Sequence, residues 1–421
     1  MSNKNCSPRE TSTAVVESPA SSKKSWQQKL AAVLMVLAFV GSASAANKFW
    51  AGPSATTNSP VSGTWDTTST VWNNGTGNTA NSTFATGDVA IFGGADGTYG
   101  IMCSTLSAAT LTFGNSGYTL TNGTAVTVTA SAGGNSVNVA SGKTATIGTN
   151  VTLSITGNAG TFNAGAVLGG TLIIDNGGGM NQPGSLGFQI DGNGSTLRVL
   201  TGGMASHTGN GSGFRVANTA SSIATLSVEG GTVYVSGAST SIAIGNGAGA
   251  NGTVNISGGS VFFTNNTTGL GANATGTGTI NLNGGTLVAR NFVRTGTGTF
   301  NFNGGTLKMG PNTSQAAVFM NGLTAANVRN NGGNMDYNGA AVIIGQVLQH
   351  SAIGGDAVTD GGLTITNSGG VGSLALTNAN TYNGPTVVKN GAKLVTTSRS
   401  IGSGSYTVAD GGTLEVQIAA A

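Results

Sequence analysis

One short phrase recurs four times in this chain, and it constrains the fold more than any other feature. The phrase has the form T-φ-x-φ-x-G-G-[TS]-φ, where φ is apolar, and its copies begin at Thr225, Thr253, Thr279 and Thr299. The glycine pairs are 28, 26 and 20 residues apart and start at Gly230, Gly258, Gly284 and Gly304. A degenerate fifth copy begins at Thr196, with its pair at Gly202. Repeats of about 20 to 50 residues are typical of stacked units and not of one globule around a site.

The residues around each glycine pair alternate between apolar and polar, which is the pattern of a strand with one buried face. Before the pair, the apolar positions are Leu226 and Val228, Val254 and Ile256, Ile280 and Leu282, and Phe300 and Phe302. An antiparallel meander is one architecture for such units, because Asn-Gly between alternating strands is a strong hairpin signal. A parallel β-helix is the other, with each unit as one coil and the glycines at a corner.

We expect the helix, because the repeat length is close to one coil and equivalent polar positions would then form columns. In that arrangement Asn255, Asn281 and Asn301 would stack as a ladder of amide hydrogen bonds along the axis. A single unit would not fold alone, because about 6–12 kcal/mol from four buried apolar side chains is less than the cost of ordering its residues, about 1–2 kcal/mol each. The predicted fold class is therefore all-β, a right-handed parallel β-helix of stacked coils.

The N-terminal residues 1–45 have the features of a secretory signal peptide. Three lysines between positions 23 and 29 precede the apolar run Leu30–Val40, and Ala43-Ser44-Ala45 forms an A-x-A cleavage site. A membrane anchor is the alternative, but a spanning helix needs about 20 apolar residues and this run is shorter. Cleavage would leave a mature chain that starts at Ala46.

Removal of this segment would leave a chain without net charge. Five of the 16 basic and two of the 13 acidic residues lie in it, so eleven of each remain. Nucleic-acid binding depends on clustered basic residues, so we expect no nucleic-acid partner. Cys103 would be the one remaining cysteine, which excludes an intramolecular disulfide. The Gly-, Thr- and Asn-rich composition also occurs in disordered chains, but the recurring β-branched alternation favours strands.

The mature chain divides into three predicted regions after the signal peptide. Residues 46–108 are expected to form an N-terminal cap, residues 109–373 the β-helical repeats, and residues 374–421 a C-terminal coil region. The cap prediction rests on the aromatic and apolar residues Phe49, Trp50, Trp65, Trp72, Phe84, Ile91 and Phe92. An open solenoid end needs such a cover, since bare strand edges aggregate. A sugar-stacking platform is the alternative use of the tryptophans.

The segment 374–394, LALTNANTYNGPTVVKNGAKL, resembles the autotransporter-associated β-strand repeat. That repeat runs roughly L-x-L-x-G-x-N-T-Y-x-G-x-T-x-[VI]-x-x-G-x-L, and the matching positions are Asn380, Thr381, Tyr382, Gly384, Thr386, Val388 and Gly391, with Leu394 one residue beyond the last leucine of the pattern. Asn378 replaces the usual first glycine, and Pro385 stands where a second glycine is common. The resemblance implies a passenger-type right-handed β-helix of an exported bacterial protein, in a family whose members are mostly adhesive or structural surface proteins.

No membrane barrel or sorting tail follows this segment in the sequence, which ends at Val416-QIAAA. We therefore expect a truncated product, or a protein that reaches the surface by another route or through a separate anchor.

Residues of reactive type are few and scattered. Asp356 and Asp360 are the closest acidic pair in the repeat region; they could bind calcium or act as acid and base, but we expect a solvated turn. The loop at Asp191 is a weak match to a calcium loop, because Gly202 stands where the bidentate glutamate belongs. Arg290, Arg294 and Lys308 could form an anion or glycan patch, and a solvated face is the preferred interpretation.

The two histidines, His207 and His350, are expected in polar loops. His350 precedes Ser351, but the G-x-S-x-G motif of serine hydrolases is absent from the sequence. Metal sites need His and Cys clusters, and none is present. We therefore expect no catalytic, cofactor-binding or metal-binding residues and no cofactor.

These features predict a non-enzymatic exported protein with a structural or adhesive role, secreted or on the surface of a Gram-negative-type bacterium. Glycans or other surface and matrix molecules are the expected partners, and outer-membrane association would require an anchor from elsewhere. The alternative is a polysaccharide-binding or polysaccharide-degrading protein on the same scaffold.

Overall fold

The computed structural model describes residues 45–418 apart from 54–55, 132–135, 157–168, 185–186, 211–212, 238–240, 265, 312–316, 399 and 401. Residues 1–44, which hold nearly all of the predicted signal peptide, lie outside the described residues. All regular structure within these ranges is β-strand, and they include no helix that is long and apolar enough to cross a membrane.

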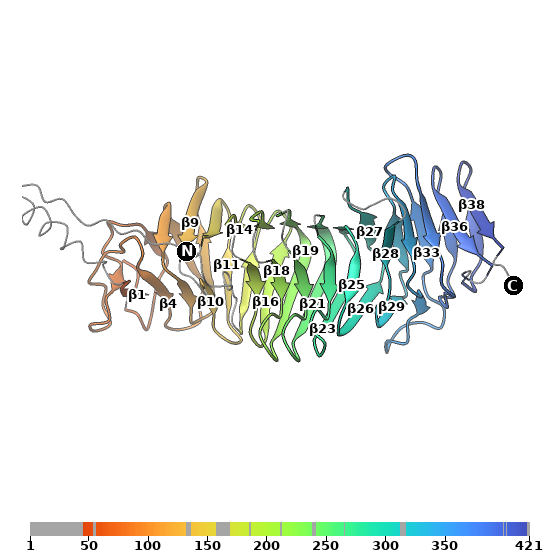
Figure 1. The fold of residues 1–421 in the computed structure, drawn as a ribbon. Coiled ribbons are helices and arrows are strands. Elements are labelled where there is room, and N and C mark those ends of the chain that lie inside the picture. The colour runs from red at the N-terminus through yellow and green to blue at the C-terminus, as the bar shows by residue number, and fades with distance from the viewer. Residues whose placement is uncertain are drawn as a thin grey trace, which may run out of the picture. The chain divides into compact units, whose positions relative to one another are not determined.

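The strands of successive coils pair in parallel, and they form three long ladders (Figure 1). The first ladder contains β2 (Gly63–Trp65), β5 (Tyr99–Cys103), β8 (Tyr118–Thr121), β11 (Thr144–Ile147), β13 (Thr171–Ile174), β16 (Ser195–Leu200), β19 (Ile223–Val235), β21 (Asn251–Phe263), β23 (Thr277–Leu282), β26 (Thr297–Phe302), β29 (Ala325–Val328) and β32 (Gln349–His350). The second contains β6 (Leu106–Ala108), β9 (Val126–Ala130), β12 (Val151–Ile155), β14 (Gly179–Gln182), β17 (Met204–His207), the second halves of β19 and β21, β24 (Thr286–Ala289), β27 (Thr306–Met309), β30 (Gly333–Asp336), β33 (Leu363–Thr366), β35 (Thr386–Val388) and β37 (Tyr406–Val408).

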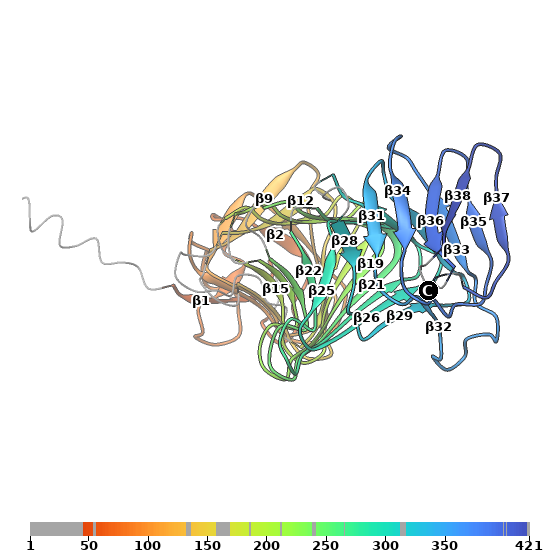
Figure 2. The same cartoon turned by 45° about the vertical axis from the view of Figure 1, so that its right-hand side comes forward.

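The third ladder and a smaller sheet complete the coils (Figure 2). The third contains β15 (Phe188–Ile190), β18 (Phe214–Val216), β20 (Ile242–Ile244), β22 (Thr268–Leu270), β25 (Phe292–Arg294), β28 (Ala317–Met320), β31 (Ala341–Ile344), β34 (Ser373–Leu376), β36 (Lys393–Thr397) and β38 (Thr413–Gln417). The smaller sheet contains β1 (Asn47–Trp50), β3 (Trp72–Asn73), β4 (Val89–Phe92), β7 (Leu111–Phe113) and β10 (Val137–Val139). Among the described strands, β1 and β3 form the one antiparallel pair.

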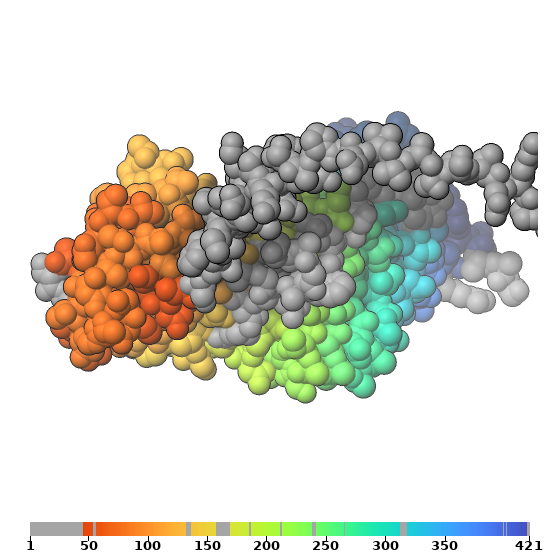
Figure 3. Space-filling model, turned by 60° about the vertical axis from the view of Figure 1, so that its left-hand side comes forward, coloured from red at the N-terminus to blue at the C-terminus, as the bar shows by residue number. Residues whose placement is uncertain are grey.

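The repeated phrases stack on one another in register, as a β-helix requires. Thr225 pairs with Thr253, Thr253 with Thr279, and Thr279 with Thr299. The prediction of a parallel β-solenoid is therefore confirmed, and the antiparallel meander is wrong. Figure 3 shows the same order on the surface, where the colours of successive coils adjoin from orange through green to blue.

The glycine pairs lie where one coil bends over the backbone of the coil before it. Gly259 has a φ of +71°, and a Cβ there would lie 2.0 Å from the carbonyl oxygen of Gly231. At Gly285 a Cβ would lie 2.6 Å from the carbonyl oxygen of Gly259. Because backbone stacks directly on backbone at this corner, any side chain on the second glycine would clash. This contact explains why the phrase keeps its glycines.

The apolar positions of the phrase fill the interior of the coils. Leu226, Val228, Val254 and Ile256 are fully buried and belong to one continuous core. Their alternating neighbours point away from it, as strand geometry requires. Alternation in the sequence thus predicted the two faces of these strands correctly.

The three tryptophans of the predicted cap region pack against one another. Trp50, Trp65 and Trp72 are each fully buried. The rings of Trp50 and Trp72 meet edge to face at 5.1 Å, and Phe84 meets Trp65 in the same way at 5.1 Å. No indole face is open to a ligand, so these residues form no sugar-stacking platform.

Candidate functional site

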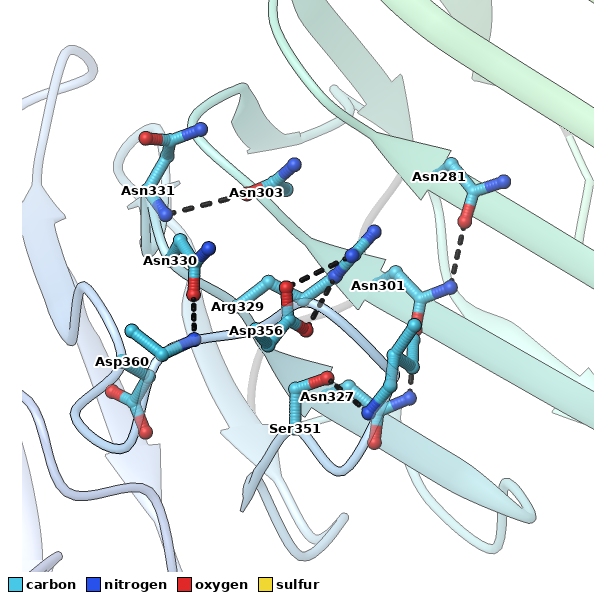
Figure 4. A network of polar contacts seen from close by, with 12 residues as sticks. Asn281, Asn301, Asn303, Asn327, Arg329, Asn330, Asn331, Ser351, Asp356 and Asp360 are labelled. Atoms are coloured by element: carbon cyan, nitrogen blue, oxygen red, sulfur yellow. Dashed lines mark hydrogen bonds and ion pairs between the residues drawn. The ribbon is translucent and has the colours of Figure 1, made fainter.

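Polar side chains of the first ladder bond to one another from coil to coil. The Asn281 amide donates to the Asn255 oxygen at 2.7 Å. Asn301 donates to Asn281 at 2.6 Å (Figure 4). Asn327 then donates to Asn301 at 2.7 Å, and Gln349 to Asn327 at 3.0 Å. The predicted stacking of Asn255, Asn281 and Asn301 is confirmed. We call the row from Asn255 to Gln349 the asparagine ladder.

The repeat in the sequence does not predict the last two members of this ladder. Asn327 and Gln349 lie outside the copies of the phrase, and the glycine pair at Gly332 follows Asn327 by five residues instead of three, so the repeat gives no register for them. Nor does it predict a second row, in which Asn246 donates to Asn218 at 2.7 Å and Asn218 donates to Gln189 at 2.9 Å. Only the stacking of the coils shows that these side chains share a column.

The acidic pair of the repeat region holds neighbouring coils together. Asp356 receives two hydrogen bonds from the Arg329 guanidinium, at 2.8 and 2.9 Å (Figure 4). These bonds hold the pKa of the Asp356 carboxyl below its usual value. Asp360 is 4% exposed and accepts backbone N–H groups of Gly384 at 2.8 Å and Gly362 at 2.9 Å. The expected solvated turn is therefore wrong for Asp360, because the next coil covers it.

His350 also bonds to Asp360, with its Nδ1 3.0 Å from the carboxylate. Such a pair could orient a general base, but a nucleophile would have to face the Nε2 of the same ring. Ser351 follows directly in the chain and is 3% exposed, and its oxygen accepts the N–H of Ile353 at 3.2 Å. A substrate has no access to this buried hydroxyl, so the three residues do not form a hydrolase triad.

His207 lies inside the solenoid and not in a polar loop, so that prediction is wrong. It is the last residue of β17, pairs in register with Gln182 and Val235, and is fully buried. Its Nε2 and both side-chain amide atoms of Gln182 have no hydrogen-bond partner among the described residues. Burial lowers the pKa of His207, which keeps the ring neutral. The alternation Met204-Ala-Ser-His, aligned with Val233 and Val235, would have indicated this inward position.

The remaining candidates also have structural partners. Asp191 is 4% exposed and accepts the backbone N–H groups of Asn218 at 3.0 Å and Thr219 at 3.1 Å. Arg294 lies in the third ladder, whereas Lys308 lies in the second and pairs with Asp336 at 3.4 Å. Across the part of the chain that the structure describes, no three His, Cys, Asp or Glu residues gather as a metal site.

One hollow on the outer face of the second ladder differs from these packed contacts. It encloses about 700 Å³ and crosses β19, β21, β24, β27 and β30. Its floor is the outward column Tyr234, Phe262, Val288, Lys308 and Asp336, which are consecutive register partners. A second outward column beside it contains Ser260, Thr286 and Thr306. We call this hollow the outer groove.

The two ends of the outer groove differ in chemistry. At one end Tyr234 is 40% exposed, and its ring meets that of Phe262 at 5.7 Å. At the other end Asp336 accepts hydrogen bonds from the Ser368 hydroxyl at 2.6 Å and the Asn338 N–H at 2.9 Å. Burial alone would raise the pKa of Asp336, but these bonds and the Lys308 charge together lower it. The carboxylate is therefore ionised and neutralised in place.

Comparisons of the chain with protein-family models, with curated proteins and with solved structures find no match. The resemblance of residues 374–394 to the autotransporter-associated repeat stays a prediction. In the structure Asn380 of this motif bridges coils, because it accepts the Leu348 N–H at 2.8 Å and donates to the Ser400 carbonyl at 2.8 Å. Tyr382 is fully buried, with its hydroxyl 2.6 Å from that of Thr386 in the same segment.

Proposed function

We propose that this protein is a non-enzymatic exported β-solenoid with a structural or adhesive role outside the cell or on its surface. The observation that supports it is the use of the polar side chains. The asparagine ladder, the Arg329–Asp356 pair and the Asp360 carboxylate all join one coil to the next. Such side chains stabilise a long scaffold and leave few reactive groups free for chemistry.

The finer features of the fold belong to the same proposal. The coils turn in the right-handed sense, because parallel strands are joined by right-handed connections in about 98% of cases. The buried cluster of Trp50, Trp65 and Trp72 closes the N-terminal end and protects the strand edges there. Export is supported by the charged, apolar and A-x-A segments within residues 1–45.

A polysaccharide-degrading enzyme is the alternative, and the outer groove is the place where it would act. Hydrolysis of a glycosidic bond commonly needs two carboxyl groups about 5–10 Å apart across the bond. Among the described lining residues Asp336 is the one carboxylate, and it already binds Lys308, Ser368 and Asn338. This arrangement favours binding over cleavage.

The location of the protein tests the proposal. The full chain is expressed in a Gram-negative host, and intact cells are probed with antibody and with added protease. We expect antibody labelling or release into the medium, and a mature N-terminus at Ala46 by mass spectrometry. An unprocessed protein in the cytoplasm would contradict the proposal.

A further inference from the structure

We infer that the outer groove binds an uncharged polysaccharide laid along the solenoid axis. Such a polysaccharide would be the ligand for the adhesive role proposed above. The inference rests on that role in one respect, that the protein meets the polysaccharide outside the cell. Binding itself depends on the groove and can be measured on the purified protein.

The length and volume of the groove suit a chain-like ligand. Its floor runs over five consecutive coils, from Tyr234 to Asp336. Strands are about 4.8 Å apart, so these four steps span about 19 Å. The volume of about 700 Å³ lies within the range of ligand sites. A ligand that follows the axis would cross one residue of this column on each of the five coils.

The floor of the groove offers the two kinds of contact that a sugar ring needs. A pyranose has a face of C–H groups and a rim of hydroxyl groups. The rings of Tyr234 and Phe262 are partly exposed and adjoin each other, so their surfaces are available for the C–H face. Ser260, Thr286 and Thr306 carry outward hydroxyl groups beside them, and these hydroxyls make no hydrogen bond to a side chain or backbone group of the described residues. These hydroxyls can donate to and accept from the sugar rim.

The charge of the groove favours a neutral ligand. Lys308 and Asp336 are the charged residues of its described lining, and they bind each other. A uronate, sulfate or phosphate polymer would require the Lys308–Asp336 pair to separate and would leave the buried carboxylate uncompensated. A neutral polymer leaves the pair in place.

The backbone of this face argues against a peptide ligand. An extended peptide binds a sheet by adding a strand to a free edge. Here β21, β24 and β27 are paired with a neighbouring coil on each side. Their backbone groups are therefore occupied, and only side chains are offered to a ligand.

The test is retention of the purified chain, residues 46–421, in affinity gels that contain cellulose, xylan, mannan, amylose or alginate. We expect retention by at least one of the four neutral polymers and none by alginate. Retention by alginate alone, or by none of the five, would overturn the inference. Binding to unfolded casein but not to the neutral polymers would indicate a peptide surface and would also overturn it.

Substitutions then locate the site. Tyr234→Ala and Phe262→Ala should each weaken retention at least about tenfold, the factor that corresponds to about 1.4 kcal/mol. The double variant Thr286→Val/Thr306→Val keeps β-branched side chains in the strands and should also weaken it, with unchanged thermal unfolding. Phe49→Ala, a half-buried aromatic of β1 outside the groove, is the matched control and should bind as the wild type does. Unchanged binding by a folded Tyr234→Ala and by the double variant would refute the assignment.

The two proposals fail in distinguishable ways. A cytoplasmic location with intact polysaccharide binding would refute the exported role alone. Export without retention by any neutral polymer would refute the groove assignment alone.

Discussion

Replacing Asn301 with alanine removes the central rung of the asparagine ladder. In the structure this side chain donates to Asn281 at 2.6 Å and accepts from Asn327 at 2.7 Å, and it is 4% exposed. Two hydrogen bonds are lost, at about 0.5–1.5 kcal/mol each, and one oxygen and one N–H group are left without partners in a poorly solvated row. We expect the free energy of unfolding to fall by about 2–5 kcal/mol.

The matched control is Asn303→Ala, two residues later on the same coil. Asn303 also donates to the coil before it, at 3.0 Å from Asn283, but this pair is open to solvent. Water replaces the lost partner, so we expect a decrease of at most about 1.5 kcal/mol. Both variants are unfolded in guanidinium chloride and followed by far-UV circular dichroism. Equal stabilities for the two variants would refute the claim that the buried ladder holds the coils together.

Three further predictions concern other parts of the solenoid. Gly259→Ala should destabilise the protein by about 2–4 kcal/mol, because its Cβ would clash with the backbone of the preceding coil. Gly258→Ala is the control and should cost much less, because the nearest atom is 3.3 Å from its Cβ. Similar melting temperatures for the two variants would contradict the close backbone stacking at this corner. Burial lowers the pKa of His207, so its ring stays neutral in the folded chain at a pH where it gains a proton in the unfolded chain. The free energy of unfolding should therefore be highest above about pH 6.5, the unfolded pKa, and fall as the pH drops below it. His207→Val should reduce this pH dependence, measured by guanidinium titrations at one pH above and one pH below that value. Cys103 is 1% exposed and burial raises the pKa of its thiol, so in the chain that starts at Ala46, and therefore lacks Cys6, it should react with a maleimide only after denaturation; rapid labelling of this native chain would disprove its burial.

The sequence predicted those features that repeat at a constant offset from a glycine pair. Leu226, Val254 and Ile280 are buried, and Asn255, Asn281 and Asn301 are stacked, because each copy of the phrase repeats one coil position. The next two coils have no glycine pair at this offset. Asn327 and Gln349 join the ladder only because spacing between coils brings them into register.

The outer groove and the buried histidine show a different limit of the sequence. Alternation places Tyr234 and Phe262 on the outer face, but whether that face is hollow depends on residues far along the chain, such as Asp336. The polar residue type of His207 predicts a loop, whereas its position at the end of a strand points it inward. Stacking of coils, and not local pattern, determines both outcomes.

The distance between Thr196 and Thr299 tests the stacking of the coils most directly. These two residues are four register steps apart in the first ladder. Spin labels at both positions, in a chain with Cys6 and Cys103 replaced by alanine, report their separation by double electron–electron resonance. Four stacked coils predict about 19 Å between the two backbone positions. In an antiparallel meander each unit would add two strands to the sheet, so the same two positions would lie eight strand spacings apart, about 38 Å. A measured distance near that value would contradict the solenoid.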